Sequence, residues 1–555
     1  MDFSYLNDTL VMLLATVTVV VLFLRMGLPP ILGYLAVGVS VGPYGFGVVY
    51  DVEHIKTLAE FGVVFLMFTI GLEFSATMLM RMKTSVFGLG GAQVLMTSAL
   101  ATALAIALGV RLDSALVIGG VVAMSSTALV IKQLTDQVEL HTRHGRNSVG
   151  ILLFQDLMVV PLLILVASLS GEGGQASTIT VVTALAEGLL ALLIIFAFGR
   201  WVLRPLFREV ARFRSAELFT LTVLLVVLCS SWLTGFIGLT FALGAFLAGV
   251  MLSETEFRHQ VESEIRPFRD VLLGLFFITV GMMLDVSMLP ETWLLVLALL
   301  VGLVLLKALL VALFCRIGGW NNAVSMRTGL ILAHGGEFGF AILIMAMDGE
   351  IIRPDEGQVL LASMLCSMAL APIIIRYNGR LTSLLLPRSV EQSRLEIKEL
   401  ILDTSRSLNH HVIVCGFGRV GRDSVNCLIE QQIPCMAIDL DSELVQKGLG
   451  EKKPVSYGDA GSLELLHACG LRRASALVIT MIDFNTAMKI ITRVRAVDHE
   501  IPILVRTRKE IHLYQLYQAG ATEVVADIFG SDQMLTLEML GRHKLMPVGS
   551  GEYSI

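Results

Sequence analysis

"LLFQDLMVVP", residues 152–161, places a single carboxylate, Asp156, inside an apolar stretch that runs from Ser148 to Ser168. A stretch of this length matches the ~20 residues with which an α-helix crosses a bilayer. An ionised Asp at the centre of such a helix costs about 2.5–3.5 kcal/mol on insertion scales. A carboxylate kept at that depth, with the oxygen donor Gln155 beside it, indicates a functional site in a membrane protein.

Apolar runs of similar length occupy most of the chain up to Leu386. Of the 555 residues, 55% are hydrophobic and only 16% are charged, whereas soluble domains carry about 25% charge. The net charge of −6 does not suggest a nucleic-acid partner. The composition predicts a polytopic α-helical protein of the lipid bilayer with thirteen spans, at about 7–24, 30–47, 58–74, 86–109, 114–132, 147–169, 178–203, 217–234, 236–253, 269–285, 292–315, 325–347 and 357–376.

The chain has a different pattern beyond the last apolar run. Residues 387–409 are polar and charged, and we expect them to form a linker. From residue 410 onward, short β-branched runs alternate with helical stretches, which is typical of an α/β domain. The predicted domains are therefore a transmembrane domain at 1–386, a linker at 387–409 and an α/β domain at 410–555.

The loops between the thirteen spans differ in their basic residues. If the N-terminus lies outside, the inner loops carry fifteen Lys and Arg residues, and the outer loops carry three, Lys56, Arg111 and Arg353. Cytoplasmic loops are enriched in basic residues. We therefore expect the N-terminus outside and the C-terminal α/β domain in the cytoplasm.

Two further charged residues fall inside predicted spans. Lys307 is central in the run 292–315, and Glu337 lies in the run 325–347. A buried Lys can take part in a site directly, or it can neutralise a partner for structural reasons. The sequence leaves both interpretations of Lys307 open.

Polar or helix-breaking residues interrupt two of the predicted spans. The run 325–347 contains the adjacent Gly335 and Gly336, and the run 114–132 contains three consecutive hydroxyl residues, Ser125, Ser126 and Thr127. Interrupted helices in two halves of a chain are typical of inverted-repeat transporters, in which unwound backbone replaces water around an ion. Small residues for close helix packing are the alternative explanation, and it could account for either stretch alone.

Several runs of the transmembrane part resemble the second monovalent cation:proton antiporter family, specifically its Kef-type potassium/proton antiporters: "SSTALVIKQL", "ILLFQDLMVVPLL", "GLTFALGAFLAGVMLSE", "ESEIRPFRDVLLGLFFITVGMMLD" and "GGEFGFAIL". The resemblance implies a homodimer in the bacterial cytoplasmic (inner) membrane, with two partly unwound helices that cross. It also implies that Gln155 and Asp156 mark the ion and proton site, and that Lys307 is the family's buried lysine. The predicted ion- and proton-binding residues are Ser125, Ser126, Thr127, Gln155, Asp156, Lys307 and Glu337.

The chemistry of one carboxylate agrees with the exchange that the resemblance implies. A single carboxylate can hold a proton or a dehydrated monovalent cation, and the two compete for it. Competition at Asp156 together with alternating access would give potassium/proton antiport, with no metal beyond the transported cation. A sodium/proton antiporter of the same architecture remains an alternative, because the site residues do not distinguish two alkali cations.

A dinucleotide-binding fingerprint opens the C-terminal domain. The strand pattern "HVIVCG" at 411–416 runs into "GFGRVG", which places glycines at 416, 418 and 421 at the start of a helix. A second strand ends at Asp439, 18 residues after Gly421, close to the ~20 expected for an acidic residue that contacts a ribose. Further strands at 454–458, 476–480, 503–507 and 523–527 predict a six-stranded parallel Rossmann domain.

This domain resembles the TrkA-N-like, potassium-conductance-regulating domains attached to Kef antiporters and to some potassium channels. The resemblance implies bound AMP or NAD(H), with Asp439 at the ribose disfavouring the 2′-phosphate of NADP. A degenerate Rossmann module that only dimerises is the alternative. The predicted nucleotide-binding residues are Gly416, Phe417, Gly418, Arg419, Val420, Gly421, Asp439, Leu440, Asp459, Ala460 and Arg506.

The segment 253–270 mixes acidic and basic residues between two predicted spans. It resembles the Kef regulatory loop, and by the orientation argument it faces the cytoplasm. We expect a loop there on which the Rossmann domain docks, with Glu262 and Glu264 as the regulatory residues. A solvated charged loop without a partner is the simpler alternative.

Other functional classes fit the sequence less well. A membrane-bound NAD-dependent oxidoreductase would need a catalytic acid or base beside the nicotinamide, or a second redox centre, and no pattern suggests one. A potassium channel would need a TVGYG-like filter, which the sequence does not contain. We therefore expect a transporter and not an enzyme.

Overall fold

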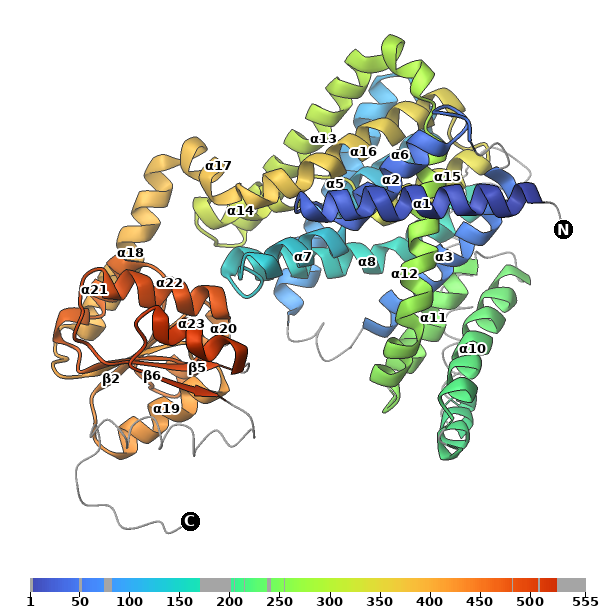
Figure 1. Cartoon of the computed structure of the whole chain (residues 1–555). Helices are drawn as coiled ribbons and strands as arrows, with labels where there is room; N and C mark the ends of the chain where they lie inside the picture. The colour runs from blue at the N-terminus through green and yellow to red at the C-terminus, as the bar shows by residue number, and fades with distance from the viewer. Residues whose placement is uncertain are drawn as a thin grey trace. The chain divides into compact units, whose positions relative to one another are not determined.

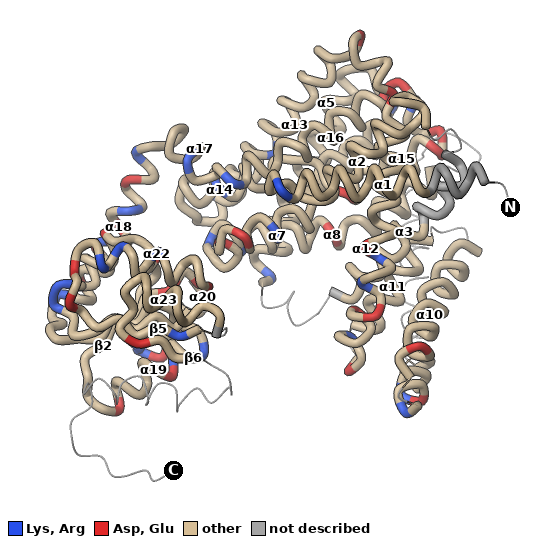
Figure 2. Tube along the Cα trace, viewed as in Figure 1, with Lys and Arg blue, Asp and Glu red and all other residues tan. Residues whose placement is uncertain are grey.

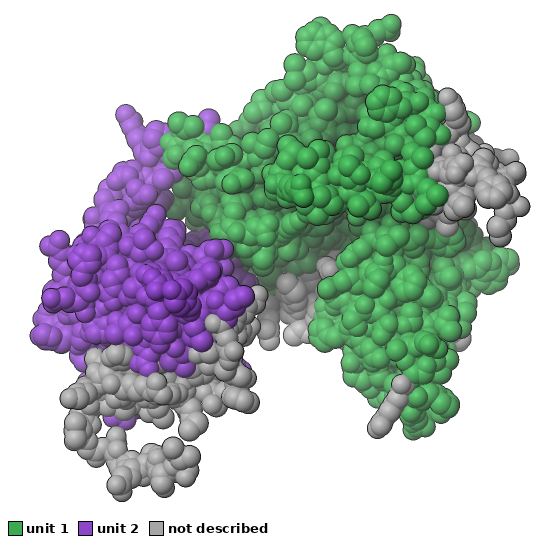
Figure 3. Space-filling view, in the orientation of Figure 1, with its two compact units in different colours: residues 1–140, 144–384 green, residues 141–143, 385–555 purple. Residues whose placement is uncertain are grey.

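The protein is described by a computed structural model that covers residues 3–48, 52–73, 82–169, 201–203, 205–213, 215–236, 241–253, 255–481, 483–507 and 510–526. The chain divides into two compact units (Figure 3). The first, a helical membrane unit, comprises Met1–Leu140 and His144–Leu384. The second, the α/β unit, comprises His141–Arg143 and Leu385–Ile555.

Helices make up the membrane unit (Figure 1). Six described helices are long and apolar enough to cross a bilayer, counting the interrupted stretch Leu112–Asp136 as one, and Figure 2 shows long stretches of them without charge. The helices are α1 (Phe3–Arg25), α2 (Pro30–Val41), α3 (Val52–Glu73), η1 (Thr84–Gly90), α5 (Gly91–Ala107), α6 (Leu112–Ala123), α7 (Thr127–Asp136), α8 (Arg143–Leu169), α10 (Ala216–Phe236), α11 (Phe241–Ser253), α12 (Arg258–Met282), η2 (Val286–Met288), α13 (Leu289–Ile317), α14 (Asn322–Ile331), α15 (Glu337–Asp348), α16 (Pro354–Arg376) and α17 (Asn378–Leu385).

Each predicted span coincides with a helix or a pair of helices, except the one at 178–203, which lies almost entirely outside the described residues. The two predicted interruptions are confirmed. Residues 124–126 separate α6 from α7, and residues 332–336 separate α14 from α15. Each of these spans is therefore two half-helices with non-helical backbone between them.

The expectation of a loop at 253–270 is wrong, because α12 begins at Arg258. Val261 and Ile265, four residues apart, are buried in the core of the membrane unit and give this segment one apolar helical face. Glu262 and Arg266 form an i,i+4 ion pair at 3.6 Å. The charge density concealed the helical period.

Most of the segment 387–409, expected to be a linker, is helical, as α18 (Pro387–Ser405). Pro387 is the first helical residue, a position that suits its fixed φ angle and its missing N–H. Ile401 is fully buried in the core of the α/β unit, and Ile397 packs against the same core. The segment is therefore an amphipathic helix of that unit.

The α/β unit contains a six-stranded parallel sheet of order β3-β2-β1-β4-β5-β6, as predicted for a Rossmann domain. Two apolar cores lie in this unit. The strands are β1 (Val412–Cys415), β2 (Cys435–Asp439), β3 (Val455–Tyr457), β4 (Ala476–Ile479), β5 (Ile503–Thr507) and β6 (Glu523–Ala526). The helices after α18 are α19 (Arg419–Glu430), α20 (Ser442–Gly450), α21 (Leu463–Ala468), η3 (Leu471–Arg473), α22 (Phe484–Arg495), η4 (Glu510–His512) and α23 (Leu513–Gln518).

Glycines allow two helices of the membrane unit to cross with their backbones in contact. A Cβ atom on Gly249 of α11 would lie 2.1 Å from the carbonyl oxygen of Phe68 in α3, and one on Gly71 of α3 would lie 2.2 Å from that of Phe246. No side chain fits at either position without separating the helices. Close backbone approach at small residues is how helices associate in membranes, where no hydrophobic driving force joins them.

We predict that Gly249→Ala destabilises the protein by about 1–3 kcal/mol, because its methyl group overpacks the α3–α11 crossing. Thermal unfolding of the detergent-purified protein measures the effect. Gly302→Ala is the matched control, since a Cβ on this glycine of α13 meets nothing within 4 Å. Equal melting temperatures for the two variants would show that the crossing is not close-packed.

Candidate ion site and nucleotide site

The two helix breaks of the membrane unit touch each other. The hydroxyl of Ser125 donates to the carbonyl oxygen of Leu332 at 3.0 Å. A Cβ on Gly336 would lie 2.5 Å from the carbonyl carbon of Ser125, so only glycine allows this approach. The predicted crossing of the two unwound helices is therefore present.

Lys307 holds the crossing together from α13. Its side chain is fully buried, and Nζ donates to the carbonyl oxygen of Met124 at 2.5 Å, to Oγ of Ser125 at 2.8 Å and to the carbonyl oxygen of His334 at 2.7 Å. These bonds use all three N–H groups of an ammonium. Met124 and His334 follow the C-terminal ends of α6 and α14, where helix dipoles attract a cation.

Glu337 lies at the same crossing, beside the N-terminal ends of two helices. It is the first residue of α15, and its Oε1 accepts from the backbone N–H of Ala128, near the start of α7, at 3.4 Å. A carboxylate between two helix N-termini complements their positive dipoles. Its Oε2 is buried and makes no hydrogen bond among the described residues. Ser126 caps α7 by accepting from the N–H of Leu129 at 3.2 Å.

Asp156 lies in the middle of α8 with 4% of its surface exposed. The hydroxyl of Thr127, the first residue of α7, lies 3.0 Å from its Oδ1 and 3.2 Å from its Oδ2 and donates to the carboxylate. The carboxylate is thereby placed beside the positive N-terminal end of α7. A buried carboxylate with a hydroxyl and a helix N-terminus around it can hold a proton or a small cation.

Gln155 fixes the first helix break. Its Oε1 accepts from the backbone N–H of Ser125 at 2.8 Å, and its Nε2 donates to Oε1 of Gln93 at 2.7 Å. Nε2 of Gln93, on α5, donates in turn to the carbonyl oxygen of Ala123 at 3.1 Å. Gln155, predicted as an oxygen ligand, thus has its carbonyl oxygen engaged by the backbone of the break.

All the predicted ion-site residues lie at or beside the two breaks. Sequence reasoning missed two participants, Gln93 and His334. Gln93 was visible as an amide within the apolar run 86–109, whereas His334 contributes a backbone carbonyl, which any residue type supplies. Lys307 forms no ion pair with an acidic side chain that the structure describes, so its partners are helix ends.

The predicted regulatory residues Glu262 and Glu264 lie in the N-terminal half of α12. Oε2 of Glu264 accepts from the hydroxyl of Thr220 on α10 at 2.7 Å. Glu262 pairs with Arg266 and lies 4.0 Å from His259. Both carboxylates therefore already have partners within the membrane unit.

The fingerprint glycines shape the loop between β1 and α19. Gly416 has a φ of +105°, which favours glycine. A Cβ on Gly421 would lie 2.0 Å from the carbonyl oxygen of Gly416, whereas one on Gly418, the N-cap of α19, would meet nothing within 4 Å. The N-terminus of α19 is thus open at a backbone turn of the kind that holds a phosphate.

Asp439 closes the same loop at the end of β2. Its Oδ2 accepts from the N–H of Phe417 at 2.5 Å, and its Oδ1 accepts from the N–H of Asp441 at 2.7 Å. Burial raises the pKa of this carboxyl above its usual value, although the two N–H groups oppose the shift. Leu440 follows directly, so both lie at the carboxyl edge of the sheet beside the glycine turn.

The remaining predicted nucleotide residues follow the next strands. Oδ1 of Asp459 accepts from the N–H of Gly461 at 2.7 Å, and Oδ2 lies 3.6 Å from Nζ of Lys489. Ala460 is buried in the core. Arg506 is buried near the end of β5. Arg419 and Val420 lie at the start of α19, after β1, and Arg506 lies within β5. The predicted residues therefore come from both sides of the point where the strand order reverses, which is where ligands bind in open parallel sheets.

A helical membrane unit in which two broken helices cross beside a buried carboxylate, joined to a parallel α/β unit, defines a membrane transporter of the exchanger class. The chain matches the family described as sodium/hydrogen exchanger, transmembrane, over residues 10–377 and the TrkA-N domain over residues 412–527. The chain belongs to the sodium/hydrogen exchanger family and carries a TrkA-N domain. The expected transporter, rather than an enzyme, is confirmed.

Two curated relatives indicate by their names the branch of the family to which the chain is similar. The chain is 42% identical, over 96% of its length and 82% of the relative's, to a protein named K(+) efflux antiporter KefB from Alkalimonas amylolytica. It is 40% identical, over 97% of its length, to a protein named K(+) efflux antiporter 1, chloroplastic, from Arabidopsis thaliana, of whose length it spans about half (46%). The Kef-type resemblance found in the sequence is confirmed.

A solved structure supports the fold. The chain is similar to the sodium proton antiporter MjNhaP1 from Methanocaldococcus jannaschii, with a TM-score of 0.52 and 17% identity, over 68% of this chain and 98% of the other. At this identity the likeness shows the fold alone.

We predict that Lys307→Met destabilises the membrane unit, because the carbonyl oxygens of Met124 and His334 lose their donor and each buried unpaired group costs about 1–3 kcal/mol. Thermal unfolding in detergent measures it. Leu309→Met, at an exposed position of the same helix, is the control. Unchanged stability would count against a structural role and would favour Lys307 as a titrating proton carrier.

Proposed function

We propose that the chain is a potassium/proton antiporter in which Asp156 is the carboxylate that cation and proton share. The observation that carries the proposal is the buried carboxylate of Asp156, held by the hydroxyl of Thr127 at the N-terminus of a broken helix. The names of the curated relatives support potassium as the cation. The family membership supports exchange for protons.

The proposed mechanism uses competition at one site. A proton on Asp156 removes the negative charge that attracts a cation, and a bound cation in turn disfavours protonation. Further oxygens near the breaks come from the hydroxyls of Ser125, Ser126 and Thr127. Oε2 of Glu337, which makes no hydrogen bond within the described part of the chain, is another. Lys307 and Gln155 hold the breaks in place and are not carriers in this proposal.

Sodium/proton exchange is the second candidate. It is favoured by the matched family, which is described as sodium/hydrogen exchanger, transmembrane. Oxygen donors can bind either alkali cation, so measured selectivity has to decide between them.

The α/β unit is proposed to bind AMP or NAD(H) and to regulate transport. Support comes from the open N-terminus of α19 and from Asp439, which would meet a ribose and repel a 2′-phosphate. We also propose a homodimer in a bacterial cytoplasmic membrane, with the N-terminus outside and the α/β unit in the cytoplasm. The charged half of α12, with Glu262 and Glu264, is the proposed regulatory surface.

We predict that Asp156→Asn abolishes potassium-driven proton movement in proteoliposomes and leaves the protein folded, because Asn cannot exchange a proton for a cation. The rate should fall to that of protein-free vesicles for both potassium and sodium gradients. Asp136→Asn, an exposed carboxylate at the end of α7, should keep the parental rate. Exchange by Asp156→Asn near the parental rate would rule out this carboxylate as the shared site.

We predict that AMP or NAD(H) binds the purified full-length protein. NADP should bind at least about tenfold more weakly, because Asp439 would repel its 2′-phosphate. Gly418→Asp should remove nucleotide binding, because it adds negative charge at the phosphate position. Isothermal titration calorimetry measures each affinity. Gly450→Asp is the matched control, because a Cβ there also meets open space. Nucleotide binding by Gly418→Asp at parental affinity would refute this position for the site.

A further inference from the structure

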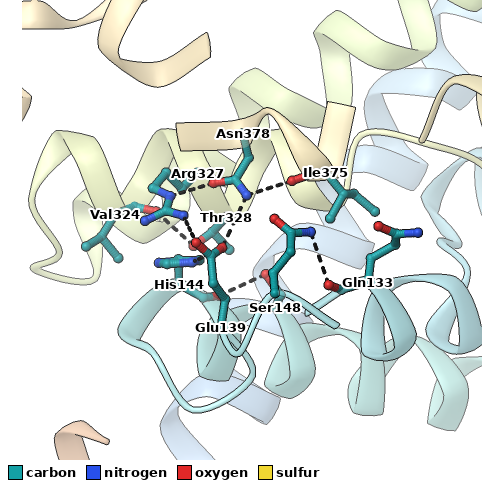
Figure 4. A network of polar contacts seen from close by, with 10 residues as sticks. Gln133, Glu139, His144, Ser148, Val324, Arg327, Thr328, Ile375 and Asn378 are labelled. Carbon is teal, nitrogen blue, oxygen red and sulfur yellow. Dashed lines mark hydrogen bonds and ion pairs between the residues drawn. The ribbon is translucent and has the colours of Figure 1, made fainter. Parts of the chain in front are cut away.

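A second polar network, with two buried and two partly exposed members, lies in the membrane unit, apart from the helix breaks. We call Glu139, His144, Arg327 and Asn378 the Glu139 cluster (Figure 4). Oε1 of Glu139 accepts from Nη2 of Arg327 at 2.6 Å, and Oε2 lies 3.0 Å from Nε2 of His144 and accepts from Nδ2 of Asn378 at 3.3 Å. Nε of Arg327 donates to Oδ1 of Asn378 at 2.5 Å. Every member therefore contacts Glu139.

The cluster joins the helices that build the ion site. Glu139 lies between α7 and α8, His144 is in the first turn of α8, and Arg327 is on α14. The helices α7 and α14 are the half-helices that end at the two breaks, and α8 carries Asp156. A displacement of the cluster is therefore a displacement of the helices around Asp156.

The backbone at the cluster is strained and closely packed. Val138, a β-branched residue, has a φ of +58° directly before Glu139, a conformation that such side chains rarely adopt. A Cβ on Gly145 would lie 2.1 Å from the carbonyl oxygen of Glu139. Strain of this kind persists where surrounding contacts enforce it, and it is frequent at switch regions.

The ion pair of the cluster persists across physiological pH. Burial raises the pKa of Glu139, but the hydrogen bond with His144 and the charge of Arg327 outweigh it and hold the pKa at about 2. Glu139 is therefore ionised at neutral pH. Something other than protonation of this carboxylate has to move the cluster.

Asn378 connects the cluster to the rest of the chain. It is the first residue of α17, is 1% exposed, and also donates to the carbonyl oxygen of Ile375 at 2.7 Å. Between it and Ser405, Leu386 alone is not helical. At the far end of α18, the hydroxyl of Ser405 donates to the carbonyl oxygen of Ala468 in the α/β unit at 2.6 Å.

We propose that the Glu139 cluster is the junction through which the α/β unit controls the ion site. Helix α18 is bonded to the α/β unit through Ser405, and Asn378 at the start of α17 is bonded to the cluster. A conformational change in the α/β unit would therefore displace α17, and Asn378 would transmit this displacement to α7, α8 and α14. The proposal rests on the proposed function, since it requires exchange that responds to nucleotide. It needs no contact between the surfaces of the two units.

Asn378→Ala tests the junction, because it removes the bonds to Arg327 and Glu139 and leaves both nucleotide and ion sites in place. The exchange rate of full-length protein in proteoliposomes is measured with and without AMP or NAD(H). For Asn378→Ala the ratio of the two rates should fall to about 1, the value for uncoupled sites, while nucleotide affinity stays parental. Ser383→Ala, at an exposed position of the same helix, should keep the parental ratio.

The outcomes separate the two proposals. A parent protein that exchanges no cation for protons overturns the proposed function. A parent that exchanges and responds to nucleotide, together with an equal response of Asn378→Ala, overturns the junction alone. A parent that exchanges without any nucleotide response overturns the regulatory part of the function and the junction together.

Hydrogen–deuterium exchange on the parent protein covers the case in which Asn378→Ala does not fold. Nucleotide should change the exchange of amides at 137–142 and in α14, because the cluster includes Glu139 and Arg327. Changes confined to the α/β unit would overturn the junction.

Discussion

The contact on which the membrane unit depends is the ammonium of Lys307 between two carbonyl oxygens and one hydroxyl. It stands where the C-terminal ends of α6 and α14 approach each other, and its three bonds neutralise two helix ends that would otherwise repel. Unwound backbone is tolerated at membrane depth only where its polar groups are satisfied by protein or water. Lys307 therefore satisfies polar groups at both breaks, and the proposed ion site lies beside them.

A basic and an acidic side chain lie at opposite kinds of helix end in this crossing. Lys307 donates to carbonyl oxygens that follow the C-terminal ends of α6 and α14, and Glu337 lies against the N-terminal ends of α7 and α15. Asp156 lies beside the start of α7 and accepts from the hydroxyl of Thr127, and it is the carboxylate that we propose for the cation and the proton. Gln155 is adjacent to Asp156 in the sequence, but its Oε1 accepts from the backbone N–H of Ser125 and so holds the helix break.

The sequence predicted the elements whose signal is local. A carboxylate in an apolar run, hydroxyls and glycines in two spans, and a glycine fingerprint between strand and helix each have a short signature, and the structure has them. The N-terminal half of α12 and the helix α18 were not predicted, because dense charge concealed their apolar faces, Val261 with Ile265 and Ile397 with Ile401. Partners such as Gln93, the carbonyl of His334 and Asn378 depend on which helices meet, and a single sequence does not encode that in any local pattern.

The central claim is that one carboxylate, Asp156, holds either the cation or the proton. It is tested most directly by the potassium concentration that half-saturates exchange in proteoliposomes, measured as a function of pH on the parent protein. Competition predicts that this concentration rises as the pH falls, by up to about tenfold per pH unit, while the maximal rate at saturating potassium changes much less. A half-saturating concentration that does not change with pH would contradict the account, because cation and proton would then occupy separate groups.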